Sequence, residues 1–166
     1  MTLRTGDSSG AAISELLMQG IIPASKPNYD APALPRDLTQ VGDEELMVLY
    51  SELTAYADFV SVQVSCAQVD ERYIEKKLSS AENIKMLQVK SAGIDSKSES
   101  RVTFARAQVA IDPMIVDYKQ ELEQSYAYRK LIEAIASNLE RDSSLVSREL
   151  TRRTATTGRR SNRWSA

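Results

Sequence analysis

The chain of 166 residues contains no histidine and only one cysteine, Cys66. The lack of histidine excludes a histidine-based catalytic triad and the usual zinc sites, and a single cysteine excludes a disulfide within one chain. Cys66 falls where a helix would carry a core-facing apolar residue, and no histidine is present to activate its thiol. We therefore expect Cys66 to be a buried packing residue.

Glycine and aromatic residues are also scarce, with six glycines, five prolines and 6% aromatics. This composition disfavours a β-sandwich, which needs many tight turns, and favours an all-α fold. The glycines nowhere take the spacing of a phosphate-binding loop. The acidic clusters at 43–45, 70–71 and 121–123 occur among lysines and arginines, which is typical of solvated faces and ion pairs. We expect a protein that is not an enzyme, with no cofactor and no metal.

Long hydrophobic runs are missing as well. The N-terminus has no apolar run of the length that a signal peptide needs, and no segment approaches the ~20 apolar residues of a membrane span. We expect a cytoplasmic protein that does not contact a membrane.

Residues 1–35 hold four of the five prolines and three of the six glycines. This composition predicts a flexible, mostly disordered arm. Within it, residues 11–20 (AAISELLMQG) have the pattern of a short amphipathic helix. Two interpretations stay open, a transient helix and a docking peptide that packs on a partner subunit.

A long apolar stripe follows, stepping by three and four residues, which is typical of one face of a helix in a coiled coil. It consists of Leu46, Leu49, Leu53, Ala57, Val60, Val64, Ala67, Ile74, Leu78 and Ala81. No glycine or proline lies between Gly42 and Gly93, so one helix of ~45 residues is the simplest prediction. Residues 91–100 have loop composition, and Gly93 suits a helix C-cap.

A short helix is predicted for residues 101–111 (RVTFARAQVAI), followed by a start signal in which Asp112 caps a new helix and Pro113 takes its first position. The second long stripe consists of Ile115, Tyr118, Leu122, Tyr126, Ile132, Ile135 and Leu139. We therefore predict a long antiparallel helical hairpin over residues 36–153 with a short linking helix.

A two-helix core is thin, so we expect the hairpin to form a homo-oligomer. The expected oligomerisation residues are Leu46, Leu49, Leu53, Val60, Val64, Ile132, Ile135 and Leu139. Tyr118, Tyr126 and Tyr128 lie close to Arg129 and Lys130, a combination on which single-stranded bases can stack. Core packing is the favoured interpretation of Tyr118 and Tyr126, because they continue the apolar stripe.

Charge is distributed unevenly along the chain. Residues 147–166 hold six arginines and one glutamate, a net charge of +5, so the rest must carry −7 to reach the total of −2. A flexible basic tail is predicted for residues 154–166, and arginines next to an exposed tryptophan suit single-stranded nucleic acid. The candidate nucleic-acid-binding residues are Arg148, Arg152, Arg153, Arg159, Arg160, Arg163 and Trp164. A solubilising tail or a patch for an acidic protein is the alternative.

Three stretches, PRDLTQVGDEEL, AIDP and YAYRKLIEAIASNLERDSSLVSRELTRR, resemble small tailed-phage proteins related to the UvsY recombination mediators. The resemblance covers roughly residues 36–153. It implies a helical, ring-forming protein in the bacterial host cytoplasm that binds single-stranded DNA. It also implies a recombinase and a single-strand-binding protein as partners, with no catalytic residue. The competing hypothesis is a phage structural or assembly protein that works through helical packing.

Overall fold

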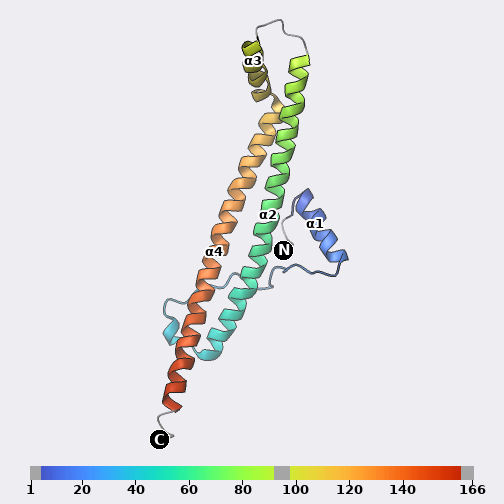
Figure 1. Cartoon of the computed structure of the whole chain (residues 1–166). Helices are drawn as coiled ribbons and strands as arrows, with labels where there is room; N and C mark the ends of the chain where they lie inside the picture. Colours follow the sequence, from blue (N-terminus) through green and yellow to red (C-terminus); the bar gives the residue numbers. More distant parts are fainter. Residues whose placement is uncertain (1–4, 92–97, 162–166) are drawn as a thin grey trace. The chain divides into compact units, whose positions relative to one another are not determined.

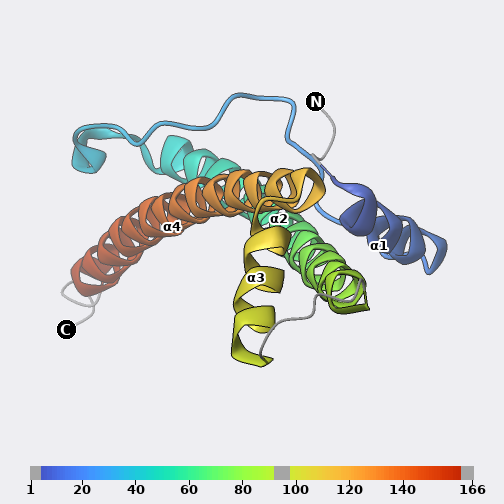
Figure 2. The same cartoon turned by 90° about the horizontal axis from the view of Figure 1, so that it is seen from above.

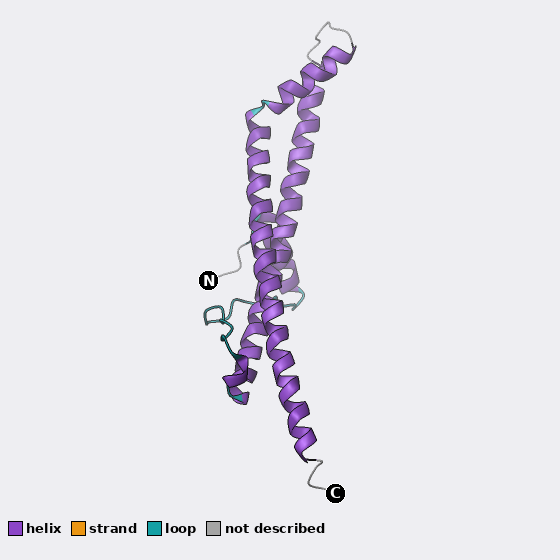
Figure 3. Cartoon of the chain, turned by 90° about the vertical axis from the view of Figure 1, so that its left-hand side faces the viewer, coloured by secondary structure: helices purple, strands orange, loops and turns teal. Residues whose placement is uncertain are grey.

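The computed structural model describes residues 5–91 and 98–161. Their regular structure is helical, with α1 at Asp7–Met18, the short 3-10 helix η1 at Leu38–Gln40, α2 at Asp43–Ser91, α3 at Ser98–Ala110 and α4 at Pro113–Ser161 (Figures 1 and 3). No strand occurs in these ranges. The all-α prediction, with two long helices and a short one between them, is therefore confirmed. The predicted cap at Gly93 lies outside the described residues.

Both long helices begin with residues that favour a helix start, and those of α4 are the predicted pair Asp112 and Pro113. Asp43, Glu44 and Glu45 fill the first turn of α2, where acidic side chains interact favourably with the helix dipole. At the start of α4, the carboxylate of Asp112 accepts a hydrogen bond from the backbone N–H of Met114 at 3.1 Å. Pro113 occupies the first helical position, where its missing N–H has no cost.

The described residues form two compact units, and the first contains residues 13–65 and 131–161. Within it, α2 contributes Leu46, Leu53 and Val60 to the core, and α4 contributes Ile132, Leu139 and Val146, all at most 9% exposed. Both sets step by seven residues, the repeat of packed helices in coiled coils. The N-terminal end of α2 contacts α4 at Arg153, so the two helices run antiparallel in this unit.

The second unit contains residues 5–12, 66–91 and 98–130. Its buried apolar side chains come from three helices: Cys66, Ala67 and Ile74 of α2, Ala105 and Val109 of α3, and Ile115 of α4. Three ion pairs connect α2 with α4 or the residue before it: Lys85 with Asp112, Glu82 with Lys119 and Glu71 with Arg129. In these three pairs the α2 residue comes earlier in the sequence as its partner comes later, so the two helices run antiparallel in this unit as well.

The prediction for Cys66 is confirmed, because its side chain is only 5% exposed. Burial, followed by the nearby charge of Asp70, raises the pKa of the Cys66 thiol. A raised pKa lowers the fraction of thiolate, which is the reactive form of cysteine.

The N-terminal arm has more structure than its composition predicts. The Asp70 carboxylate of α2 accepts hydrogen bonds from the backbone N–H groups of Gly6 at 2.8 Å and Ser9 at 2.9 Å, and from the Ser9 hydroxyl at 2.7 Å. Asp70 thus caps the start of α1, a role that a residue at the start of the helix itself ordinarily has. The composition of the N-terminal arm does not predict this cap, because Asp70 lies 61 residues after Ser9.

Residues 19–37 form an extended segment between α1 and η1 (Figure 2). Tyr29 holds this segment on α2: its hydroxyl donates to the backbone oxygen of Glu52 at 3.3 Å, and its ring lies 6.5 Å from that of Tyr56. Tyr56 in turn makes an edge contact with Phe59 at 6.0 Å. The contact at Tyr29 falls inside the 1–35 arm for which we predicted flexibility.

The C-terminal boundary differs too, because α4 continues past residue 153 to Ser161. The hydroxyls of Thr151, Thr154 and Thr156 donate to backbone oxygens one turn earlier, at 2.8 to 2.9 Å. These threonines therefore satisfy their polar groups inside the helix, and each added residue continues the backbone hydrogen-bond ladder. The start of the predicted flexible tail, at residue 154, is thus helical.

Candidate nucleic-acid interface

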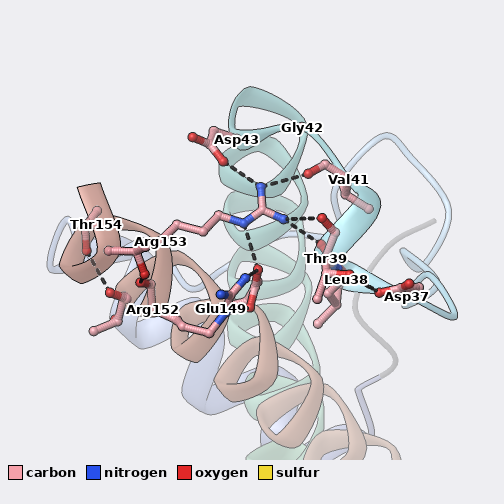
Figure 4. A network of polar contacts seen from close by, with 12 residues as sticks. Asp37, Leu38, Thr39, Val41, Gly42, Asp43, Glu149, Arg152, Arg153 and Thr154 are labelled. Atoms are coloured by element: carbon pink, nitrogen blue, oxygen red, sulfur yellow. Dashed lines mark hydrogen bonds and ion pairs between the residues drawn. The ribbon is translucent and has the colours of Figure 1, made fainter. Parts of the chain in front are cut away.

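Arg153 lies at the centre of a polar network that joins α4 to the segment before α2 (Figure 4). Its guanidinium donates to the backbone oxygens of Leu38 at 2.8 Å, Thr39 at 3.2 Å and Val41 at 2.8 Å. It also contacts the carboxylates of Asp43 at 2.5 Å and Glu149 at 2.7 Å. The Arg153 side chain is only 18% exposed.

This geometry occupies the donors through which Arg153 would bind nucleic acid. A guanidinium reaches a phosphate through the same N–H donors that Arg153 directs at carbonyl and carboxylate oxygens of its own chain. Binding a phosphate would require these bonds to break. In this conformation Arg153 therefore connects α4 to the segment before α2 in the first unit, and its contact with nucleic acid stays a prediction from the sequence.

Glu149 is the acidic partner of two arginines. Arg152 donates two hydrogen bonds of 2.7 Å to its carboxylate, and Arg153 donates one of 2.7 Å. The hydrogen bonds from Arg152, and then those from Arg153, lower the pKa of Glu149 to about 2. Glu149 is therefore ionised at neutral pH and cancels one positive charge of this region.

Arg148 and Arg152 remain accessible on α4. Arg148 is exposed, and it lines a shallow cavity of about 270 Å³ in the first unit with Tyr50, Ser143, Ser144 and Ser147. The Arg152 side chain is 59% exposed although it is bonded to Glu149. These two arginines can meet a polyanion without disturbing the core.

The other candidate residues are beyond the side chains that the structure describes. Positions 159 and 160 belong to α4, and residues 163 and 164 lie after the described part of the chain. Their assignment as Arg159, Arg160, Arg163 and Trp164 of a nucleic-acid site stays a prediction from the sequence.

The residues predicted for oligomerisation divide into two groups. Leu46, Leu53, Val60, Ile132 and Leu139 are buried within the chain itself. A side chain buried between helices of its own chain has no surface for a second subunit, so these five residues are intrachain core in this conformation. Leu49 and Val64 are half-buried, and Ile135 is 50% exposed.

The tyrosines of α4 also differ in their exposure. Tyr118 and Tyr128 are half-buried, but Tyr126 is 49% exposed. The Arg129 guanidinium lies 5.2 Å and the Lys130 ammonium 5.8 Å from the centre of the Tyr126 ring. Core packing was the favoured interpretation of Tyr126, and its exposure shows that it does not belong to the core.

A groove in the second unit was not expected from the sequence. It has a volume of about 610 Å³ and lies between residues 73–88 of α2 and residues 112–118 at the start of α4. Apolar and aromatic side chains line it together with three lysines, Lys76, Lys77 and Lys85. The spacing of Tyr73, Lys77, Ser80 and Ile84 along one face of α2 was the only available sequence signal.

Among the described residues, no group of three or more acidic, histidine or cysteine side chains is arranged to hold a metal ion. Nor does any helix in that part of the chain combine the length and apolar character needed to cross a membrane. Comparisons with protein-family models, curated proteins and solved structures gave no match.

Proposed function

We propose that this chain is a non-catalytic phage protein that binds single-stranded DNA and serves as a recombination mediator or accessory protein. The observation that carries the proposal is the pair of exposed arginines, Arg148 and Arg152, on α4 close to the most basic part of the sequence. Arg159, Arg160, Arg163 and Trp164 follow in the sequence and extend the same basic region.

Electrostatics favours binding at this end of the chain. Residues 1–146 carry a net charge of −7, which repels a phosphate backbone, whereas residues 147–166 carry +5. Arginines that neutralise phosphates release counterions, which gives affinity without sequence preference. Tryptophan adds a surface on which any base can stack. Single strands suit such a site because their bases are accessible.

The resemblance to UvsY-type mediators supplies the rest of the proposal. It suggests a homo-oligomer in the bacterial host cytoplasm, with a recombinase and a single-strand-binding protein as partners. Several weak basic ends in one oligomer would bind one strand with high avidity.

A pair of matched variants tests the site. Arg148→Ala and Arg141→Ala each remove one exposed arginine from α4, seven residues apart and thus on similar faces, but only Arg148 belongs to the basic end. We expect Arg148→Ala to weaken binding of a fluorescent single-stranded oligonucleotide several-fold at low salt, and Arg141→Ala to change it much less. Equal effects, or no binding by the wild type at low salt, would refute the proposal.

A phage assembly protein is the second candidate function. Large apolar side chains are well exposed, including Met18 and Ile22 at 82% and Leu131 at 69%. Where such side chains gather in one patch, they are typical of proteins that bind other proteins. Stable association with other phage proteins, in the absence of any affinity for nucleic acid, would favour this candidate.

A further inference from the structure

The groove of the second unit has exposed apolar side chains along its lining. Ile84 and Met114, which line it from α2 and α4, are 57% and 58% exposed. Tyr73 and Tyr118 line it as well, and Tyr73 is 38% exposed. Exposed apolar side chains around a groove of about 610 Å³ suit an apolar segment better than water.

The charged residues of the groove are mostly positive. Three lysines, Lys76, Lys77 and Lys85, line it with one acid, Asp112. Asp112 is already paired with Lys85 at 2.6 Å. A segment that fits this groove should therefore be apolar, carry acidic side chains and lack basic ones.

One segment of the same chain has this composition. Residues 13–22 hold five exposed large apolar side chains: Leu16 at 37%, Leu17 at 51%, Met18 at 82%, Ile21 at 52% and Ile22 at 82% exposure. Asp7 and Glu15 are the charged residues between positions 5 and 25, and no lysine or arginine occurs there.

The end of α1 fixes these apolar side chains in one arrangement. Gly20 has φ +78°, the left-handed conformation that often ends a helix. The backbone N–H of Ile21 donates to the Leu16 oxygen at 2.9 Å, and that of Gly20 to the Leu17 oxygen at 3.0 Å. This pair of bonds is a Schellman motif, which brings Ile21 beside Leu16. Less conformational entropy is lost on binding when the binding segment is already ordered.

We propose that residues 13–22 of one copy of this chain dock in the second-unit groove of another copy. The exposed apolar side chains of the segment cover Tyr73, Ile84 and Met114, and Glu15 faces the lysines of the groove. The two contacting surfaces differ, so the interface is head-to-tail, and its repetition builds a ring or a filament. This inference does not depend on nucleic-acid binding.

Three substitutions of exposed apolar residues by glutamate test the interface in the full chain. Met18→Glu alters the segment, Ile84→Glu alters the groove, and Leu131→Glu is the control, on α4 in the first unit. We expect the wild type and Leu131→Glu to sediment as multiples of 18.4 kDa and the other two as monomers. Circular dichroism should show unchanged helicity in all three, because each side chain is exposed.

Mixing the two interface variants tests the head-to-tail arrangement. The Met18→Glu chain keeps an intact groove and the Ile84→Glu chain keeps an intact segment, so an equimolar mixture can form one interface and should give a dimer. A mixture that stays monomeric would overturn the proposal. A monomeric wild type, or assembly that survives both substitutions, would overturn it too. Occupation of the groove by an acidic peptide of another protein, with no self-association, would also do so.

Discussion

The Arg153 guanidinium and the Asp43 carboxylate, 110 residues apart in sequence, are in contact at 2.5 Å in the first unit. The same guanidinium bonds to the backbone oxygens of Leu38, Thr39 and Val41. These carbonyls precede α2, and Arg153 supplies donors to all three of them; the Leu38 oxygen also accepts from the backbone N–H of Val41 at 3.4 Å. The contact explains why the segment before α2 has a defined structure.

Arg153→Ala should lower the melting temperature by several degrees. The substitution leaves Glu149 with one arginine partner and removes donors from three backbone oxygens. Arg141→Ala is the matched control, because the Arg141 side chain is 67% exposed and its ion pair with Asp142, at 3.4 Å, should contribute little to stability. Thermal unfolding of both variants checks the prediction, and equal shifts would contradict it.

The stability that Glu149 contributes should depend on pH in a defined window. Its pKa falls from 4.5 to about 2 in the folded chain, so its contribution is complete above about pH 4.5. The contribution of Glu149 to stability is lost as the pH falls toward 2. Its pKa is lower in the folded than in the unfolded chain, so the carboxylate stabilises the fold only while it is ionised.

The variant Glu149→Gln isolates this effect from those of the other carboxylates. It should be less stable than the wild type at pH 7, and the difference between the two should narrow between about pH 4.5 and 2. Denaturant midpoints measured across this range check the prediction. A constant difference would show that the charge of Glu149 is not involved.

The helices were predictable because their signals are local. The stripe from Leu46 and the pair Asp112–Pro113 lie within continuous segments, and they predicted α2 and the start of α4. The place of Arg153 was missed because its charge was counted with the tail arginines. Its spacing held a usable signal, since Ile132, Leu139, Val146 and Arg153 follow one another at seven residues and put Arg153 on the core-facing side.

Other features of the structure had no local signal. The bond between Ser9 and Asp70 joins residues 61 positions apart, and neither residue type is unusual in its own segment. The groove of the second unit likewise forms only because the start of α4 lies beside α2. That arrangement depends on the length of the link between the two helices. Periodicity predicts which face of a helix is buried, but it does not predict which distant side chain meets it.

The core residues that step by seven pack within one chain. Truncating a buried one should therefore lower the free energy of unfolding more than truncating an exposed residue. Leu53→Ala should destabilise the chain by about 2–5 kcal/mol, because Leu53 is fully buried and truncation leaves a cavity. Ile135→Ala, at a side chain 50% exposed, should cost less than about 1 kcal/mol. Urea unfolding measures both. A small effect at Leu53, with loss of assembly instead, would restore its assignment to a subunit interface.

Asp70→Ala should release the start of α1 while leaving the long helices folded. The substitution removes the acceptor of three hydrogen bonds, from the N–H groups of Gly6 and Ser9 and from the Ser9 hydroxyl. Amide hydrogen exchange should become faster in residues 5–18, with protection in the rest of α2 unchanged. Glu75→Ala, at an exposed position of α2, is the control. Equally fast exchange of residues 5–18 in the wild type would agree with the flexible arm and contradict the cap.

Deleting residues 154–166 should weaken binding of single-stranded DNA and flatten its dependence on salt. The deletion removes Arg159, Arg160, Arg163 and Trp164 but leaves Arg148, Arg152 and the Arg153 network intact. Each phosphate contact on a single strand contributes about 0.7 to the slope of log affinity against log salt, so the loss of three arginines should reduce the slope by about 2. The melting temperature should change little, because the core residues of α4 end before the deletion, and the helical signal should fall only by the removed end of α4. A truncated chain that binds with the full-length slope would assign the tail to solubility or to a protein contact, and phage assembly would become the better account of the chain.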